Sequence, residues 1–282
     1  MNFKNKIGFI GGGNMARSLI SGLIRQGLAP SQILVSDPGQ TARSGLQETF
    51  GVTTHADNLA VANAVDLLVL AVKPQVMQPV CEAIGAALKT RCPLIISIAA
   101  GIPASAIGNW LGESASQALA IVRCMPNTPA MIGAGASGLF ATPSTTPDQR
   151  QAAEQLLATA GLVVWVDTEA AIDAVTAISG SGPAYFFLLI EALEKAGITL
   201  GLPAETARLL AVETAYGAGA YARQSPDDPT TLRTKVTSPG GTTEAALAVF
   251  NNHNFTALVE TAAQAAAERA QALAKIAEGD AP

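Results

Sequence analysis

The sequence is poor in aromatic and charged residues. Aromatic residues make up 5% of the chain and charged residues 14%, against 49% hydrophobic residues. So apolar a composition excludes an intrinsically disordered chain. The net charge of −5 leaves no excess of positive charge to attract nucleic acid or an anionic membrane surface. We therefore expect neither as a partner.

Cysteine, histidine and long apolar runs are also scarce. Three cysteines form no paired framework, and the two histidines, His55 and His253, are far apart. These features favour a reducing cytoplasm and predict no metal site. The apolar run after Lys6 is interrupted by glycines, unlike a signal peptide. The run at 184–190 is far shorter than the roughly 20 residues that span a membrane, so we expect a soluble, cytoplasmic protein.

Two sequence patterns divide the 282 residues into two domains. In the first 165 residues, helical patterns alternate with short apolar runs, which is typical of a doubly wound parallel sheet of the Rossmann type. The predicted strands lie at 6–11, 33–36, 67–71, 94–97, 118–123 and 162–166. Over 166–282 the pattern predicts helices alone, rich in Ala and Leu, at 184–195, 204–222, 244–251 and 255–276. Their wide apolar faces favour burial against a second subunit.

The first predicted strand leads into a glycine turn. Gly11, Gly13 and Ala16 fit the spacing G-x-G-x-x-G/A, and a helix is predicted from Asn14. Gly11 permits the tight turn, Gly13 lets a pyrophosphate approach the backbone, and Ala16 allows the helix to pack closely on the strand. We interpret domain 1–165 as dinucleotide-binding, with Gly11, Gly13, Asn14 and Met15 in contact with the cofactor.

The residues after the second strand leave the choice of cofactor open. Asp37 follows Ala16 by 21 residues, where an acid usually binds the ribose 2′-hydroxyl of NAD. Ser36 precedes Asp37 and Arg43 lies six residues beyond it, and these two residues can instead hold the 2′-phosphate of NADP. A solvated helix residue is the alternative interpretation of Arg43.

Two further strand ends are expected near the cofactor. Ala71, Lys73 and Pro74 end one strand, and Ala99 follows the next. Ligands of open α/β sheets bind outside the carboxyl ends of the strands, so we place these four residues at the cofactor site. A plain surface lysine is the alternative for Lys73.

The segment 237–243, Thr-Ser-Pro-Gly-Gly-Thr-Thr, gathers hydrogen-bond donors at a predicted helix start. Its glycines leave backbone N–H groups bare, and Thr242 and Thr243 occupy N-cap and first-turn positions. One helix terminus stabilises an anion by only about 0.3–1 kcal/mol, whereas millimolar binding needs about −4.1 kcal/mol. Several donors must therefore converge on a small carboxylate, unless the segment is an ordinary cap. The densest candidates are Ser238, Gly241, Thr242 and Thr243.

Five segments together resemble the pyrroline-5-carboxylate reductase family. They are IGFIGGGNMA at 7–16, AVKP at 71–74, RCMPNTPA at 123–130, SGSGPAY at 179–185 and VTSPGGTT at 236–243. The resemblance implies reduction of Δ1-pyrroline-5-carboxylate to L-proline, the last step of proline synthesis. It implies NADPH as the cofactor, with NADH as the alternative. It also implies a helical dimerisation domain, whose dimers assemble in the family up to decamers.

The resemblance also assigns residues. It implies that Ser238, Gly240, Gly241 and Thr242 hold the substrate carboxylate, and that Thr243 is the catalytic residue, hydrogen-bonded to the ring nitrogen. Asn58 matches an asparagine near the adenosine ribose and its 2′-phosphate, and Lys73 and Pro74 match a cofactor-contacting segment.

The sequence departs from the family at three positions. Thr234 and Lys235 stand where an acid and an amide are usual, and Cys124 replaces an aliphatic residue. We interpret Lys235 as facing solvent. None of the three departures removes a proposed donor.

Two alternatives remain on sequence grounds. One is a different imine or hydroxyacid reductase; hydroxyacid enzymes carry a catalytic lysine in the helix after the second glycine turn, where the first lysine here is Lys195. The other is a dinucleotide-binding sensor without turnover, which has no need of an anion site in segment 237–243. Hydride transfer needs few catalytic side chains, because the cofactor carries the chemistry.

Overall fold

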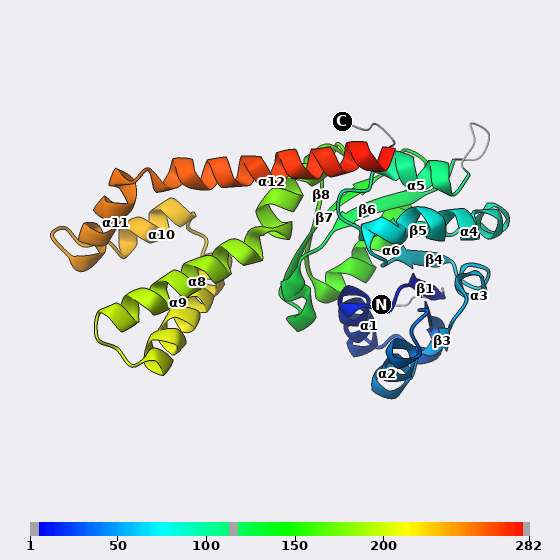
Figure 1. The fold of residues 1–282 in the computed structure, drawn as a ribbon, viewed down its shortest axis with the longest axis horizontal. Coiled ribbons are helices and arrows are strands. Elements are labelled where there is room, and N and C mark those ends of the chain that lie inside the picture. Colours follow the sequence, from blue (N-terminus) through cyan, green and yellow to red (C-terminus); the bar gives the residue numbers. More distant parts are fainter. Residues whose placement is uncertain (1–5, 113–117, 279–282) are drawn as a thin grey trace. The chain divides into compact units, whose positions relative to one another are not determined.

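The computed structural model describes residues 6–112 and 118–278, which form two compact units (Figure 1). The sheet unit contains the described residues up to Ser181 and those from Ala266 onward, and the helical unit is Gly182–Ala265. The sequence pattern places the boundary between the two domains after residue 165. In the structure, residues 166–181 belong to the sheet unit.

The sheet unit is built on an eight-stranded sheet in the order β3-β2-β1-β4-β5-β6-β7-β8. Strands β1 to β6 are parallel, β7 is antiparallel to β6, and β8 is parallel to β7. The strands are β1 Ile7–Ile10, β2 Ile33–Ser36, β3 Thr53–His55, β4 Leu67–Leu70, β5 Leu94–Ser97, β6 Ile121–Met125, β7 Gly135–Ala141 and β8 Gly161–Trp165. The strand order reverses at β1, which creates the switch point where ligands of doubly wound sheets bind.

Helices cover both faces of the sheet, as the alternating pattern predicts. On one face α1 and α6 pack against Phe9 and Val69, and on the other α3, α4 and α5 pack against Ile10 and Leu70. The helices of this unit are α1 Asn14–Arg25, α2 Gln40–Phe50, α3 Asn58–Ala62, α4 Met77–Arg91, α5 Ala104–Trp110, α6 Pro147–Leu157 and α7 Ala171–Val175. Short 3-10 turns lie at Pro30–Gln32, Pro74–Val76, Thr128–Ile132 and Ala158–Ala160, and a π-helical turn lies at Thr176–Gly180. The expected doubly wound α/β sheet is confirmed.

The helical unit contains no strand among its described residues. Its helices are α8 Gly182–Thr199, α9 Ala204–Gln224, α10 Pro229–Lys235, α11 Thr242–Asn252 and the first part of α12, Phe255–Glu278. Helices α8 and α9 approach closely, because a Cβ on Gly197 would lie 2.9 Å from that of Ala207.

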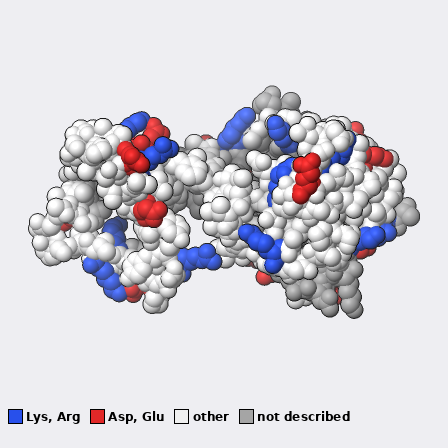
Figure 2. Space-filling view, turned by 90° about the horizontal axis from the view of Figure 1, so that it is seen from below, with Lys and Arg blue, Asp and Glu red and all other residues white. Residues whose placement is uncertain are grey.

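The helical unit leaves much apolar surface uncovered within one chain. Phe186, Phe187 and Leu188 are more than 60% exposed, and Figure 2 shows broad uncharged areas on this unit. The helical stretch Ala171–Thr199 is long and apolar enough to cross a membrane by length and composition, a test that core helices of soluble proteins also pass.

Candidate functional site

The glycine turn after β1 has an open position facing the first helix. Gly11 has φ of +100°, and a Cβ there would lie 2.6 Å from the carbonyl oxygen of Ala71, so glycine alone fits. Gly13 differs, because no atom lies within 4 Å of an added Cβ. Gly13 is the N-cap of α1, where no side chain caps the helix. The first N–H groups of α1 therefore face a space that suits a pyrophosphate.

The strand register brings the predicted cofactor residues to one edge of the sheet. Ile10 is in register with Ser36 on one side and with Leu70 on the other, and Leu70 is in register with Ser97. The residues that follow this row lie at the carboxyl ends of the strands, as predicted. They include Gly11, Gly13, Asn14, Met15, Ala71, Lys73, Pro74 and Ala99.

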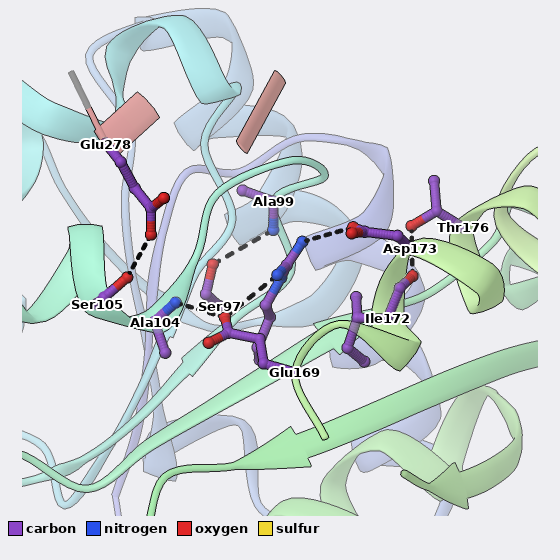
Figure 3. Close-up of polar contacts among 10 residues, drawn as sticks. Ser97, Ala99, Ala104, Ser105, Glu169, Ile172, Asp173, Thr176 and Glu278 are labelled. Atoms are coloured by element: carbon purple, nitrogen blue, oxygen red, sulfur yellow. Dashed lines mark hydrogen bonds and ion pairs between the residues drawn. The ribbon is translucent and has the colours of Figure 1, made fainter. Parts of the chain in front are cut away.

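The individual residues at this edge differ in exposure. Asn14 and Lys73 are exposed, and Met15 and Ala71 are half-buried. Pro74 opens a 3-10 turn, as expected for a proline at a first helical position. Ala99 is buried, and its N–H donates to the hydroxyl of Ser97 at 3.4 Å (Figure 3). Asn58 is the half-buried first residue of α3, behind the Asp57 cap.

The segment after β2 is held by internal hydrogen bonds. The Asp37 carboxylate accepts the N–H groups of Gly12 at 2.9 Å and Gly39 at 2.8 Å, which ties the segment to the glycine turn. Arg43 donates from Nη1 to the carbonyl oxygens of Asp37 and Pro38 at 2.7 and 2.8 Å, so its guanidinium lies beside this segment.

Ser36 ends β2, as the sequence predicts, but its side chain is not exposed to a ligand in this structure. Its side chain is fully buried, and its hydroxyl donates to the carbonyl oxygen of Phe9 at 3.4 Å. The carbonyl oxygen of Ser36 accepts the N–H of Gly11 at 2.8 Å, so its backbone lies beside the glycine turn while its side chain is buried. We therefore leave Ser36 out of the proposed cofactor contacts.

In the helical unit, segment 237–243 forms a tight turn followed by a helix. The N–H of Gly241 donates to the carbonyl oxygen of Ser238 at 3.0 Å, and Gly240 has φ of +70°. A type II turn favours glycine at its third position, where φ is positive, and commonly has proline at its second. Gly241 is the N-cap of α11, without a side-chain cap, and Thr242 is the first helical residue. The helix thus begins one residue earlier than an N-cap at Thr242 would place it.

The two glycine amides of this turn are already engaged. Gly241 N–H closes the turn, and Gly240 N–H donates to Oε2 of Glu244 at 2.7 Å. The expectation that both amides are bare is therefore wrong for this structure, because the chain satisfies them itself. The first-turn N–H groups of α11 have no intrahelical acceptor. They lie beside the exposed Ser238 and Thr242 and the half-buried Thr243.

A buried charged cluster lies close to the ligand edge, and the sequence reasoning missed it (Figure 3). Arg123 lies on β6 in register with Ser97 and is 3% exposed. Its guanidinium is 3.2 Å from Oε1 of Glu169 and 3.7 Å from Oδ1 of Asp173. Glu169 also accepts the N–H of Ala104 at 2.7 Å. An arginine inside an apolar strand is the signal that could have revealed the cluster, since a buried charge needs a partner.

The pKa of the Asp173 carboxyl is raised above its ordinary range in this cluster. Burial raises the pKa of the Asp173 carboxyl, the Arg123 guanidinium opposes that rise, and the Glu169 carboxylate adds to it. Among the described residues, two buried polar atoms of this cluster have no hydrogen-bond partner: Nε of Arg123, and Oδ1 of Asp173, which is held by the ion pair alone.

Asn127 joins two of the segments singled out in the sequence. Its side-chain amide donates to the carbonyl oxygen of Ser179 at 3.0 Å and accepts the N–H of Ala136 at 2.9 Å. The RCMPNTPA segment therefore anchors the π-helical turn that precedes the SGSGPAY helix start.

Comparison with known proteins identifies the family. The family model described as pyrroline-5-carboxylate reductase dimerisation matches residues 169–273, and the model described as NADP oxidoreductase coenzyme F420-dependent matches residues 6–101. A Pseudomonas aeruginosa protein named pyrroline-5-carboxylate reductase is 50% identical over 270 residues, 96% of this chain and 97% of that protein. The chain belongs to the pyrroline-5-carboxylate reductase family. The resemblance based on five segments is confirmed.

Solved structures of other pyrroline-5-carboxylate reductases are similar over nearly the whole chain. The Coxiella burnetii enzyme has a TM-score of 0.91 at 44% identity and covers 96% of this chain and 99% of its own. The Plasmodium falciparum enzyme, solved with NADP bound, has a TM-score of 0.83 at 27% identity and covers 96% and 98%.

Two positions that depart from the pyrroline-5-carboxylate reductase pattern have plain structural roles. Lys235 is exposed and pairs with Asp227. Cys124 is a core residue, and burial raises the pKa of its thiol to about 12 although a hydrogen bond with Ser137 opposes the rise. A thiol with so high a pKa is no nucleophile at neutral pH.

Proposed function

We propose that this protein reduces Δ1-pyrroline-5-carboxylate to L-proline with NADPH, in the cytoplasm. The observation that carries this proposal is the 50% identity to a pyrroline-5-carboxylate reductase over 96% of the chain. The family model for NADP oxidoreductases and the relative solved with NADP support NADPH over NADH.

The carboxyl edge of the sheet would hold the cofactor. The open position at Gly13 and the uncapped start of α1 fit the pyrophosphate. Asn14, Met15, Ala71, Pro74 and Ala99 follow the strand ends around it. Asn58, Lys73 and Arg43 are the proposed contacts toward the ribose and its 2′-phosphate. The bound cofactor supplies the hydride.

The turn before α11 would hold the substrate. We assign the carboxylate to Ser238, to the hydroxyl of Thr242 and to the first-turn N–H groups of α11, and the turn glycines Gly240 and Gly241 shape the backbone around it. Thr243 is the proposed partner of the ring nitrogen. A hydroxyl accepts from a protonated imine or donates to a neutral one, so Thr243 can orient the C=N bond in either state. Addition of hydride to carbon and of one proton to nitrogen gives the amine.

The decisive experiment is NADPH oxidation by the purified protein with Δ1-pyrroline-5-carboxylate. We expect turnover with this imine, and slower turnover with NADH. Parallel assays with 3-hydroxyacids and NAD test the alternative hydroxyacid activity. A well-folded sample that binds NADPH but does not reduce the imine would contradict the proposal and favour a non-catalytic sensor.

The role of Thr243 is tested by Thr243→Ala beside Thr243→Ser. Loss of one hydrogen bond to a charged group corresponds to about a ten- to hundredfold loss of kcat, and the affinity for NADPH should stay unchanged. Thr243→Ser keeps the hydroxyl and should retain most of the activity. Wild-type kcat in Thr243→Ala would remove this residue from the mechanism.

A further inference from the structure

Glu244 contacts the proposed substrate turn through its carboxylate. Oε2 of Glu244 accepts the N–H of Gly240 at 2.7 Å, and both residues belong to the helical unit. Glu244 is the third residue of α11, counted from Thr242. A glutamate at this position usually accepts the N–H of the N-cap residue in a capping box.

The contact here reaches one residue further out than in a capping box. The N-cap is Gly241, whose N–H is already used by the carbonyl oxygen of Ser238 at 3.0 Å. Glu244 therefore takes the next amide, Gly240. Together the two bonds fix both glycine amides of the turn, and the first-turn N–H groups of α11 stay available.

We propose that Glu244 is a positioning residue, which holds Gly240 in its left-handed conformation and so pre-orders the turn for the substrate carboxylate. This inference rests on the proposed function. Two adjacent glycines lose more conformational entropy on ordering than other residues do. A turn that is ordered before binding spares the substrate that cost.

The charge of Glu244 weakens substrate binding, but this effect is smaller than the gain from the ordered turn. A carboxylate beside an anion site repels the substrate carboxylate. Glu244 is exposed to solvent, where water and salt screen such a repulsion. The hydrogen bond does not depend on this charge, since an amide oxygen can also accept it. Glu244→Gln separates the two effects, because it keeps an acceptor and removes the charge.

The test compares Glu244→Ala and Glu244→Gln in steady-state kinetics. We expect Glu244→Ala to raise KM for Δ1-pyrroline-5-carboxylate about three- to tenfold, the range of one lost capping interaction, with kcat and NADPH affinity nearly unchanged. Glu244→Gln should return KM to the wild-type value or below it. Glu205→Ala removes an exposed first-turn acid from α9 and serves as the matched control, with wild-type kinetics.

A second variant, Gly240→Ala, disturbs the same turn without changing Glu244. Gly240→Ala places a Cβ in open space but at φ of +70°, which disfavours the left-handed conformation. It should raise KM as Glu244→Ala does.

The outcomes are distinct. A KM within twofold of wild type in Glu244→Ala, or a Gln variant as impaired as the Ala variant, would overturn the positioning role. Thermal unfolding and size-exclusion chromatography identify a variant that fails through folding or assembly. Absence of imine turnover in the wild-type protein would instead refute the proposed function.

Discussion

At the scale of single residues, Gly11 and Gly13 differ in the space that a side chain would find at each position. A Cβ on Gly11 meets backbone at 2.6 Å and sits at φ of +100°, whereas a Cβ on Gly13 meets nothing within 4 Å. Gly11→Ala should therefore destabilise the fold by at least about 2 kcal/mol. Gly13→Ala should leave the fold within about 1 kcal/mol of wild type and weaken NADPH binding about tenfold or more, because the new methyl group fills the space for the pyrophosphate.

Two measurements separate these effects. Thermal unfolding without cofactor reports on stability, and a fluorescence titration with NADPH reports on affinity. Wild-type NADPH affinity in Gly13→Ala would show that the pyrophosphate lies elsewhere. Near wild-type stability in Gly11→Ala would show that the turn can relax.

The spacing of the glycines predicted the cofactor turn, but not which groups are free to bind ligands. Ser36 has the right position in the sequence but points into the core. Gly240 and Gly241 have the right flexibility, but their amides are taken by Glu244 and Ser238. Tertiary packing determines which way a side chain points and which acceptors compete for an amide. The spacing of residues in the sequence does not reveal that packing.

At the scale of elements, the buried parallel strands were predictable. Strands β2 and β5 lie where the apolar runs 33–36 and 94–97 predict them, because a strand buried on both faces is apolar throughout. Strands β3 and β7 were missed. The first is three polar residues at the sheet edge, and the second, Gly-Ala-Ser-Gly-Leu-Phe-Ala, is poor in the residues that favour strands.

The buried charges that join α7 to β6 predict a pH-dependent stability. The pKa of Asp173 is raised above its ordinary value of 3.8, chiefly by burial. A carboxyl with a raised folded-state pKa stabilises the fold while it is protonated, and this contribution is lost as pH rises through the raised pKa. Asp173→Asn removes the ionisation. The variant should therefore melt at a higher temperature than wild type near pH 7, and the difference should shrink toward pH 4.

Thermal unfolding between pH 4 and pH 8 measures this difference. Asp167→Asn, at an exposed acid just before the cluster, controls for the substitution itself. A lower melting temperature of Asp173→Asn at pH 7 would mean that attraction to Arg123 outweighs the cost of burying the carboxylate.

At the scale of the whole molecule, the exposed apolar surface of the helical unit is expected to be buried against a partner. Phe186 and Phe187 are 63% and 61% exposed on α8, and contiguous apolar surface of this kind marks an interface. The family model that matches 169–273 is described as a dimerisation region. We therefore propose that a second copy covers this surface and that dimers form.

Phe187→Asp tests whether a second copy or a membrane covers α8. Light scattering after size-exclusion chromatography should give wild-type protein at least twice the chain mass of 28.7 kDa. Phe187→Asp should shift the protein toward the monomer, because a buried unpaired charge costs several kcal/mol at an interface. Leu162→Asp, at a residue of β8 with 60% exposure, is the matched control in the sheet unit and should keep the wild-type mass. A monomeric wild-type protein that sediments with lipid vesicles would contradict the dimer and assign the Ala171–Thr199 stretch to a membrane.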